Sequence, residues 1–128
     1  MDIPEQLRYS QNHEWARLDD DGRVTVGITD FAQDALGDIV FVDLPVVGRR
    51  VAGGESFAEV ESTKSVADVY APVSGTVVAV NTVLGDAPET INQDSYGAGW
   101  FAVIDPSDPA EMDRLMDAAA YADFTAQG

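Results

Sequence analysis

Residues 55–72 read ESFAEVESTKSVADVYAP, two segments of alternating apolar and polar residues on either side of Thr63-Lys64. A period of two is typical of β-strands that bury one face. If Thr63-Lys64 form a two-residue turn, apolar residues face each other across the strands, and such pairing sets the register of a hairpin. The expected apolar pairs are Val60 with Ala67, Ala58 with Val69, and Phe57 with Tyr70.

Lys64 stands at the tip of this predicted hairpin and is the only lysine in the chain. Gly54 and Gly75 bound two flanks of similar length, each running from a glycine turn to the lysine. An ε-amine at a hairpin tip is accessible to a modifying enzyme, and acylation turns it into a long neutral tether. On these residues alone, an ordinary solvated lysine remains the alternative. A longer tip loop also remains open, because Thr-Lys is not a favoured two-residue turn.

The same register places Glu59 opposite Asp68. Facing like charges cost roughly 0.2–1 kcal/mol. Two interpretations stay open: solvent screens the pair, or the two carboxylates form a negative patch that a cationic group uses.

Capping residues predict two helices. Thr29 is expected to cap a helix over Asp30–Leu36 that ends at Gly37. Asp108 is expected to cap a C-terminal helix beginning at Pro109, the preferred first position for proline. The expected core-facing stripe of this helix is Met112, Leu115, Met116 and Ala119.

The remaining pattern is that of short strands separated by turn residues. Short strands with a few peripheral helices favour a mainly β fold, a compact barrel or sandwich, and the length of 128 residues suits a single domain over 1–128. The expected strands are residues 13–18, 23–28, 39–43, 55–62, 65–71, 75–81 and 99–105.

The formal net charge is −16, which argues against nucleic acid or an anionic membrane as a partner. Two readings of the charge have equal weight: solubility, or attraction to basic clefts on partner proteins. The N-terminal segment has no basic start and no apolar core, and no apolar run is long enough for a bilayer, so we expect a cytoplasmic protein.

The composition also argues against catalysis by the polypeptide. The chain has no cysteine and a single histidine, too few ligands for a zinc site and no thiol nucleophile. His13 could serve as a base for nearby Ser10, but no oxyanion-hole motif accompanies them, and a hydrogen bond within a strand pair is the expected role of His13. We therefore expect no catalytic residues and no metal, and any thiol chemistry must come from a prosthetic group.

Five motifs together resemble the H proteins of the glycine cleavage system. They occur in the family's order over nearly the whole chain. One departure is Ser95, where the family usually has proline, which is expected to loosen a loop only. The motifs are His13–Trp15, Gly27–Gln33 with Leu36–Pro45, the lipoyl-attachment segment Val60–Val66, Ala71–Gly75, and Tyr96–Trp100.

The resemblance implies a barrel-sandwich hybrid of the biotinyl/lipoyl type with short flanking helices, including a C-terminal helix. It implies a non-enzymatic carrier with lipoate joined to Lys64 by an amide bond. The arm would take an aminomethyl group from a PLP-dependent glycine decarboxylase to a tetrahydrofolate-dependent aminomethyltransferase, and dihydrolipoamide dehydrogenase would reoxidise it. A lipoate ligase or a lipoyl/octanoyl transferase would attach the lipoate.

In this family the loaded arm folds back into a cleft, and by resemblance Glu14 and Asp68 would line it. An aminomethyl group on sulfur is a cation at neutral pH, which carboxylates favour. Other carriers remain as alternatives: a relay member of the same family that passes lipoate to other enzymes, or a lipoyl domain of a 2-oxoacid dehydrogenase complex. A biotin carrier fits less well because Thr63 and Ser65, not methionines, flank Lys64. A cofactor-free interaction module is the last alternative.

Overall fold

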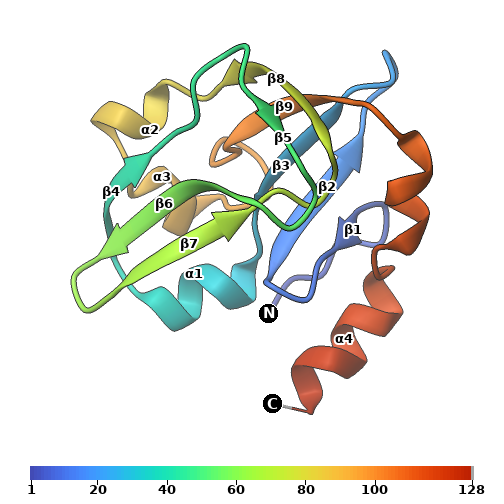
Figure 1. Ribbon diagram of the computed structural model, residues 1–128. Helices are drawn as coiled ribbons and strands as arrows, with labels where there is room; N and C mark the ends of the chain where they lie inside the picture. Colours follow the sequence, from blue (N-terminus) through green and yellow to red (C-terminus); the bar gives the residue numbers. More distant parts are fainter. Residues whose placement is uncertain (128) are drawn as a thin grey trace.

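The computed structural model describes residues 1–127, which form two antiparallel β-sheets with short helices at their margins (Figure 1). The predicted mainly β fold with flanking helices is confirmed. The larger sheet has the strand order β1-β2-β3-β9-β8-β5, and the smaller has the order β4-β6-β7. The strands are β1 Arg8–Tyr9, β2 Glu14–Leu18, β3 Val24–Ile28, β4 Ile39–Asp43, β5 Arg50–Val51, β6 Ser56–Ser62, β7 Val66–Tyr70, β8 Gly75–Val80 and β9 Ala102–Pro106.

Both sheets contribute to one main hydrophobic core. Val26 and Ile104 enter it from the larger sheet, and Val42 and Val60 enter it from the smaller sheet. Each such side chain stabilises the fold by about 1.5–3 kcal/mol when fully buried. A second cluster lies beside it around Leu7, Tyr9, Trp15 and Tyr121.

Strands β6 and β7 form the predicted hairpin. The register is the expected one between residues 58–60 of β6 and 67–69 of β7, including the facing carboxylates. The third apolar pair is wrong, because Tyr70 pairs with Ser56 and not with Phe57. A β-bulge adds one residue to β6 at this point, and Phe57 is buried in the core instead.

Helix α1 spans Asp30–Leu36, as predicted. The Thr29 hydroxyl accepts the backbone N–H of Ala32 at 3.2 Å, which satisfies one of the free amides of the first turn. At the other end, the Gly37 N–H donates to the Gln33 carbonyl at 3.0 Å. Gly37 has φ +83°, a conformation that glycine adopts far more easily than other residues, so the helix stops there.

The prediction of one continuous helix after Asp108 is wrong. The segment forms a 3₁₀ helix η1 (Pro109–Arg114) and a separate helix α4 (Ala118–Ala126). Between them, Met116 exchanges two backbone hydrogen bonds of 2.8 Å with Tyr9, and this pairing holds the chain extended. Of the expected stripe, Met112 is buried, Leu115 and Met116 are half-buried, and Ala119 is exposed.

Two further helices were not predicted, α2 (Val83–Asp86) and α3 (Thr90–Gln93). In α3 the Asn92 side chain donates to the Gly37 carbonyl at 2.9 Å and accepts the Ile39 N–H at 2.9 Å. These bonds fix the turn between α1 and β4. Among residues 1–127, no helix combines the length and apolar character needed to cross a bilayer.

Candidate functional site

Lys64 lies at the exposed tip of the β6–β7 hairpin, and the tip is held by Ser62. The Ser62 backbone N–H donates to the Ser65 carbonyl at 2.8 Å, which closes the turn. The buried Ser62 hydroxyl also accepts the backbone N–H groups of Lys64 at 3.3 Å and of Ser65 at 3.1 Å. The backbone under the lysine is therefore ordered, while its side chain is accessible.

The stem of Lys64 lies across the end of helix α1. A Cβ atom built on Gly37 would stand 3.4 Å from Cε of Lys64 and 3.9 Å from Nζ. The Thr63 N–H also donates to the Asp38 carbonyl at 3.1 Å, which ties the hairpin tip to the α1–β4 turn. Neither ion pair found in the described part of the chain involves Lys64. Its amine therefore has no ion-pair partner among the described residues, and it lies next to the helix that forms one wall of a cavity.

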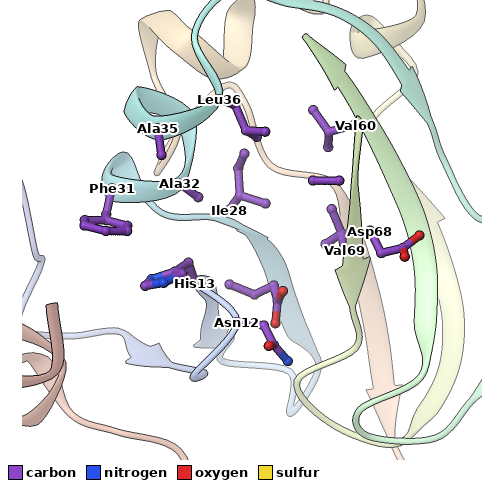
Figure 2. Close-up of a pocket in the computed structure, with 12 residues that line it drawn as sticks. Asn12, His13, Ile28, Phe31, Ala32, Ala35, Leu36, Val60, Asp68 and Val69 are labelled. Atoms are coloured by element: carbon purple, nitrogen blue, oxygen red, sulfur yellow. The ribbon is translucent and has the colours of Figure 1, made fainter. Parts of the chain in front are cut away.

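The cavity lies between α1 and the β6–β7 hairpin and has a volume of about 190 Å³ (Figure 2). In Figure 2, Ala32, Ala35 and Leu36 approach it from α1, and Val60 and Val69 approach it from the opposite side. Most of its lining is apolar, so it suits a hydrocarbon arm. The full lining is Asn12, His13, Glu14, Ile28, Phe31, Ala32, Ala35, Leu36, Val60, Ala67, Asp68 and Val69.

Glu14, at the start of β2, is the buried carboxyl of this cavity. Its side chain is buried, with 2% of the residue exposed. The Ser10 hydroxyl donates to its Oε1 atom at 2.5 Å, and the Tyr70 N–H donates to its Oε2 atom at 3.3 Å. Burial raises the pKa of Glu14 to about 7, although both hydrogen bonds oppose the rise. A cation entering the cavity would provide a counter-charge and would favour the ionised form of this carboxyl.

His13 forms the outer wall beside Glu14. Its ring stacks on Phe31 of α1, with centroids 4.5 Å apart, and both residues line the cavity (Figure 2). The Nδ1 atom lies 2.8 Å from the hydroxyl of Tyr121 on helix α4. The ring of His13 is therefore hydrogen-bonded, but the predicted bond within a strand pair is wrong, because His13 precedes β2 and its partner lies on the last helix. Burial lowers the pKa of His13 and favours the neutral ring. The structure directs the Ser10 hydroxyl to Glu14 and does not pair it with His13.

Asp68 stands at the rim of the cavity, with an exposed side chain. It faces Glu59 across the hairpin, as the register predicted, and accepts a hydrogen bond from Ser56 at 3.2 Å. The structure therefore brings Glu14 into the cavity, places Asp68 at its edge and leaves Lys64 beside Gly37.

Sequence reasoning missed the contribution of Tyr121, from the far end of the chain. No local signal marked it, because its partner His13 precedes it by 108 residues. It also missed the contact between Gly37 and Lys64, although Gly37 was correctly identified as the helix end.

Comparisons with known proteins agree on one family. The family Glycine cleavage H-protein matches residues 7–128. The chain is 58% identical over 124 residues to a glycine cleavage system H protein of Anaeromyxobacter sp. (strain K), covering 97% of this chain and 96% of the relative. It is 54% identical over 119 residues to glycine cleavage system H protein 2 of Pseudomonas aeruginosa, covering 93% and 92%.

A solved structure gives the same answer for the fold. The crystal structure of a glycine cleavage system H protein from Mycobacterium marinum superposes with a TM-score of 0.90 at 46% identity. The match covers 97% of this chain and 99% of the solved chain. The lipoyl-type barrel-sandwich fold expected from the sequence is thereby confirmed. On sequence and structure together, this chain belongs to the glycine cleavage H-protein family.

Proposed function

We propose that this chain, residues 1–128, works as one lipoyl-carrier domain of the glycine cleavage system, with lipoate joined by an amide bond to Lys64. Family membership makes it a carrier component and not an enzyme. The observation that carries the residue assignment is the position of Lys64 on an ordered hairpin tip. It is the only lysine in the sequence, it is exposed, and it takes part in neither ion pair of residues 1–127. A ligase or transferase can therefore reach one ε-amine without remodelling the fold.

The cavity beside the hairpin fits the proposed prosthetic group. When bound, lipoate supplies a disulfide–dithiol pair whose sulfur carries the aminomethyl group, chemistry that a chain without cysteine cannot perform. Leu36, Val60 and Val69 would hold the hydrocarbon part of the arm by apolar contact. Gly37 would let the lysine stem pass over the end of α1 toward this cavity, because no side chain blocks the way.

Glu14 is proposed to hold the cationic end of the cargo. Its carboxyl is desolvated, so a cation in the cavity is attracted more strongly than it would be in water. Ser10 and the Tyr70 amide keep the carboxyl in place before the cargo arrives, so little reorganisation is needed. Asp68 is proposed to add negative charge at the rim. Docking in the cavity would also keep water away from the cargo.

The proposed partners follow from the family. They are the PLP-dependent glycine decarboxylase, the tetrahydrofolate-dependent aminomethyltransferase, dihydrolipoamide dehydrogenase, and the lipoate ligase or lipoyl/octanoyl transferase that modifies Lys64. The net charge of −16 supports encounter with basic clefts on these enzymes. A cytoplasmic location is part of the proposal.

Intact-mass measurement tests the attachment site. The wild-type chain and Lys64→Arg are each incubated with a lipoate ligase, ATP and lipoate, and the spectra are compared. We expect one lipoyl increment on the wild type and none on Lys64→Arg, which keeps the positive charge but offers no acylatable amine. An increment on Lys64→Arg, or an unmodified wild type under conditions that modify another H protein, would contradict the proposal.

A second assay separates glycine cleavage from a lipoate-relay role. The lipoylated chain is mixed with the decarboxylase, the aminomethyltransferase and dihydrolipoamide dehydrogenase, and exchange between glycine and labelled bicarbonate is followed. We expect exchange that depends on the lipoylated chain. Lipoylation without exchange would point to the relay role.

A further inference from the structure

Tyr121 of α4 links two walls of the cavity without lining it. Its side chain is fully buried, and its ring stacks on Tyr9 with centroids 4.5 Å apart and planes within 8°. Its hydroxyl lies 2.8 Å from Nδ1 of His13 and 2.7 Å from Oγ1 of Thr29. Thr29 is the N-cap of α1, and His13 precedes β2. One hydroxyl group from the C-terminal helix therefore bonds to both elements that bound the outer side of the cavity.

The hydrogen bonds around this hydroxyl define a direction. Either hydroxyl can donate in the bond between Thr29 and Tyr121, and we assign the donor role to Thr29 because this bond gives its hydrogen an acceptor. The Tyr121 hydrogen is then donated to Nδ1 of His13. This order requires a neutral imidazole whose proton is on Nε2. In the reverse order a protonated Nδ1 donates to Tyr121, and the Thr29 hydrogen has no acceptor among the contacts of residues 1–127.

The protonation state of His13 matters because its ring lines the cavity that is proposed to receive a cation. His13 has φ +67°, an unfavourable conformation for a residue with a side chain, so its position depends on the contacts that hold it. Its stacking on Phe31 closes the outer wall. A protonated ring beside Glu14 would repel the cargo, whereas a neutral ring leaves the attraction of the carboxylate unopposed.

We propose that Tyr121 is a positioning residue of the arm cavity: its hydroxyl holds His13 neutral and stacked on Phe31, and so keeps the outer wall closed over the docked arm. This inference rests on the proposed function of the cavity. The titratable groups that face His13 are Glu14 beside it, Asp68 at the rim and Tyr121 itself. The carboxylates of α1, Asp30 and Asp34, line a second hollow together with Met1 and with Phe31, the ring that His13 stacks on.

Tyr121→Phe removes the hydroxyl and keeps the stacked ring. Tyr9→Phe is the matched control, because it removes the other hydroxyl of the same stacked pair, which donates to the Pro4 carbonyl at 2.6 Å. The first measurement is the ¹⁵N spectrum of the imidazole in the unmodified protein. His13 is the only histidine, so its signals need no assignment.

We expect the Nε2–H tautomer in the wild type and in Tyr9→Phe. Tyr121→Phe should show mixed tautomers and a His13 pKa closer to its ordinary value. This measurement needs no lipoate, so it tests the hydrogen-bond part of the proposal even if Lys64 carries no arm. A wild-type ring protonated on Nδ1, or an unchanged tautomer in Tyr121→Phe, would overturn the proposal.

The second measurement is the lifetime of the aminomethyl cargo on the lipoylated protein, with Glu14→Gln included. Tyr121→Phe should shorten the lifetime about three- to tenfold, and Tyr9→Phe should leave it unchanged. If Glu14→Gln shortens the lifetime and Tyr121→Phe does not, the role of Tyr121 is wrong while the cavity role stands. If neither variant shortens it, the proposed role of the cavity is wrong. Equal shortening by the two tyrosine variants would indicate general loosening and would also overturn the positioning role.

Discussion

Two glutamates of this protein accept the same kinds of hydrogen bond in different surroundings. Glu14 accepts a hydroxyl from Ser10 and a backbone N–H from Tyr70. Glu111 of η1 accepts the hydroxyl of Ser74 at 3.1 Å and its backbone N–H at 3.0 Å. Glu14 is buried in the apolar cavity between α1 and the hairpin, whereas Glu111 is half-buried near the surface.

The comparison separates the effect of hydrogen bonding from the effect of burial. Hydrogen bonds hold both carboxylates in place, so they do not distinguish the two sites. Glu111 fastens η1 to the turn at residues 72–75, a structural contact that leaves it open to water. Burial makes Glu14 different, because it raises the pKa to about 7 and leaves the charged form without solvent or a cation. A buried carboxyl of this kind can respond to a cationic ligand, and the half-exposed one cannot to the same degree.

The largest expected effect is on how stability depends on pH. In the unfolded chain Glu14 loses its proton near its ordinary pKa of 4.5, whereas in the folded protein it keeps the proton to about pH 7. The folded state therefore binds more protons in this interval, and Glu14 lowers the free energy of unfolding by about 3 kcal/mol as pH rises through it. Urea unfolding of the wild type and Glu14→Gln across this interval measures the difference.

We expect the stability difference between wild type and Glu14→Gln to change with pH over this interval, because the folded state raises the pKa of Glu14. The lowered pKa of His13 acts in the opposite direction, since its contribution is lost as pH falls below its ordinary value. His13 is present in both proteins, and its pKa is lowered by burial and not by Glu14, so its contribution cancels in the difference. A flat difference for Glu14→Gln would mean that Glu14 is charged in the folded state, and the contrast between the two glutamates would disappear.

A smaller effect is expected on retention of the cargo. Glu14→Gln keeps the size of the side chain and an oxygen that can accept hydrogen bonds, but it removes the charge that attracts the cation. Loss of this attraction in a desolvated site should shorten the lifetime of the aminomethyl cargo about tenfold, or ~1.4 kcal/mol. The rate of cargo loss from the isolated lipoylated protein measures it. Glu111→Gln should retain the cargo as the wild type does, and an equal loss in both variants would contradict the distinction.

The hairpin was predictable because its information is local. Alternation over residues 55–72 gave the strands and most of the register. The bulge at Phe57 was missed. Pairing Tyr70 with Phe57 and pairing it with Ser56 both leave the rest of the hairpin in the same register, so the alternation does not tell them apart. Helix α1 was correct in both bounds because Thr29 and Gly37 mark its ends by their own chemistry.

Features that depend on distant partners were not predictable. The pattern after Asp108 fits a single helix, but backbone pairing of Met116 with Tyr9 divides it. The contact of Tyr121 with His13 likewise joins the two ends of the chain. The role of Glu14 was predicted only from the family resemblance. An alternating strand pattern buries every second residue, whereas residues 14–16 of β2 are all buried. The second hydrophobic cluster covers the other face of β2, and short-range patterns do not report it.

The smallest effect is expected from a third carboxylate, that of Asp68. It lines the same cavity as Glu14 but is exposed at the rim, where water and salt screen its charge. Asp68→Asn should therefore change the lifetime of the cargo by less than about fivefold, since exposed ion pairs contribute only about 0–1 kcal/mol. It should also relieve the repulsion from Glu59 across the hairpin. The rate of cargo loss is measured at low and high salt. A tenfold effect that persists in high salt would mean that Asp68 turns inward when the arm docks. Burial of a carboxylate in this structure would then not be enough to identify the group that holds the cation.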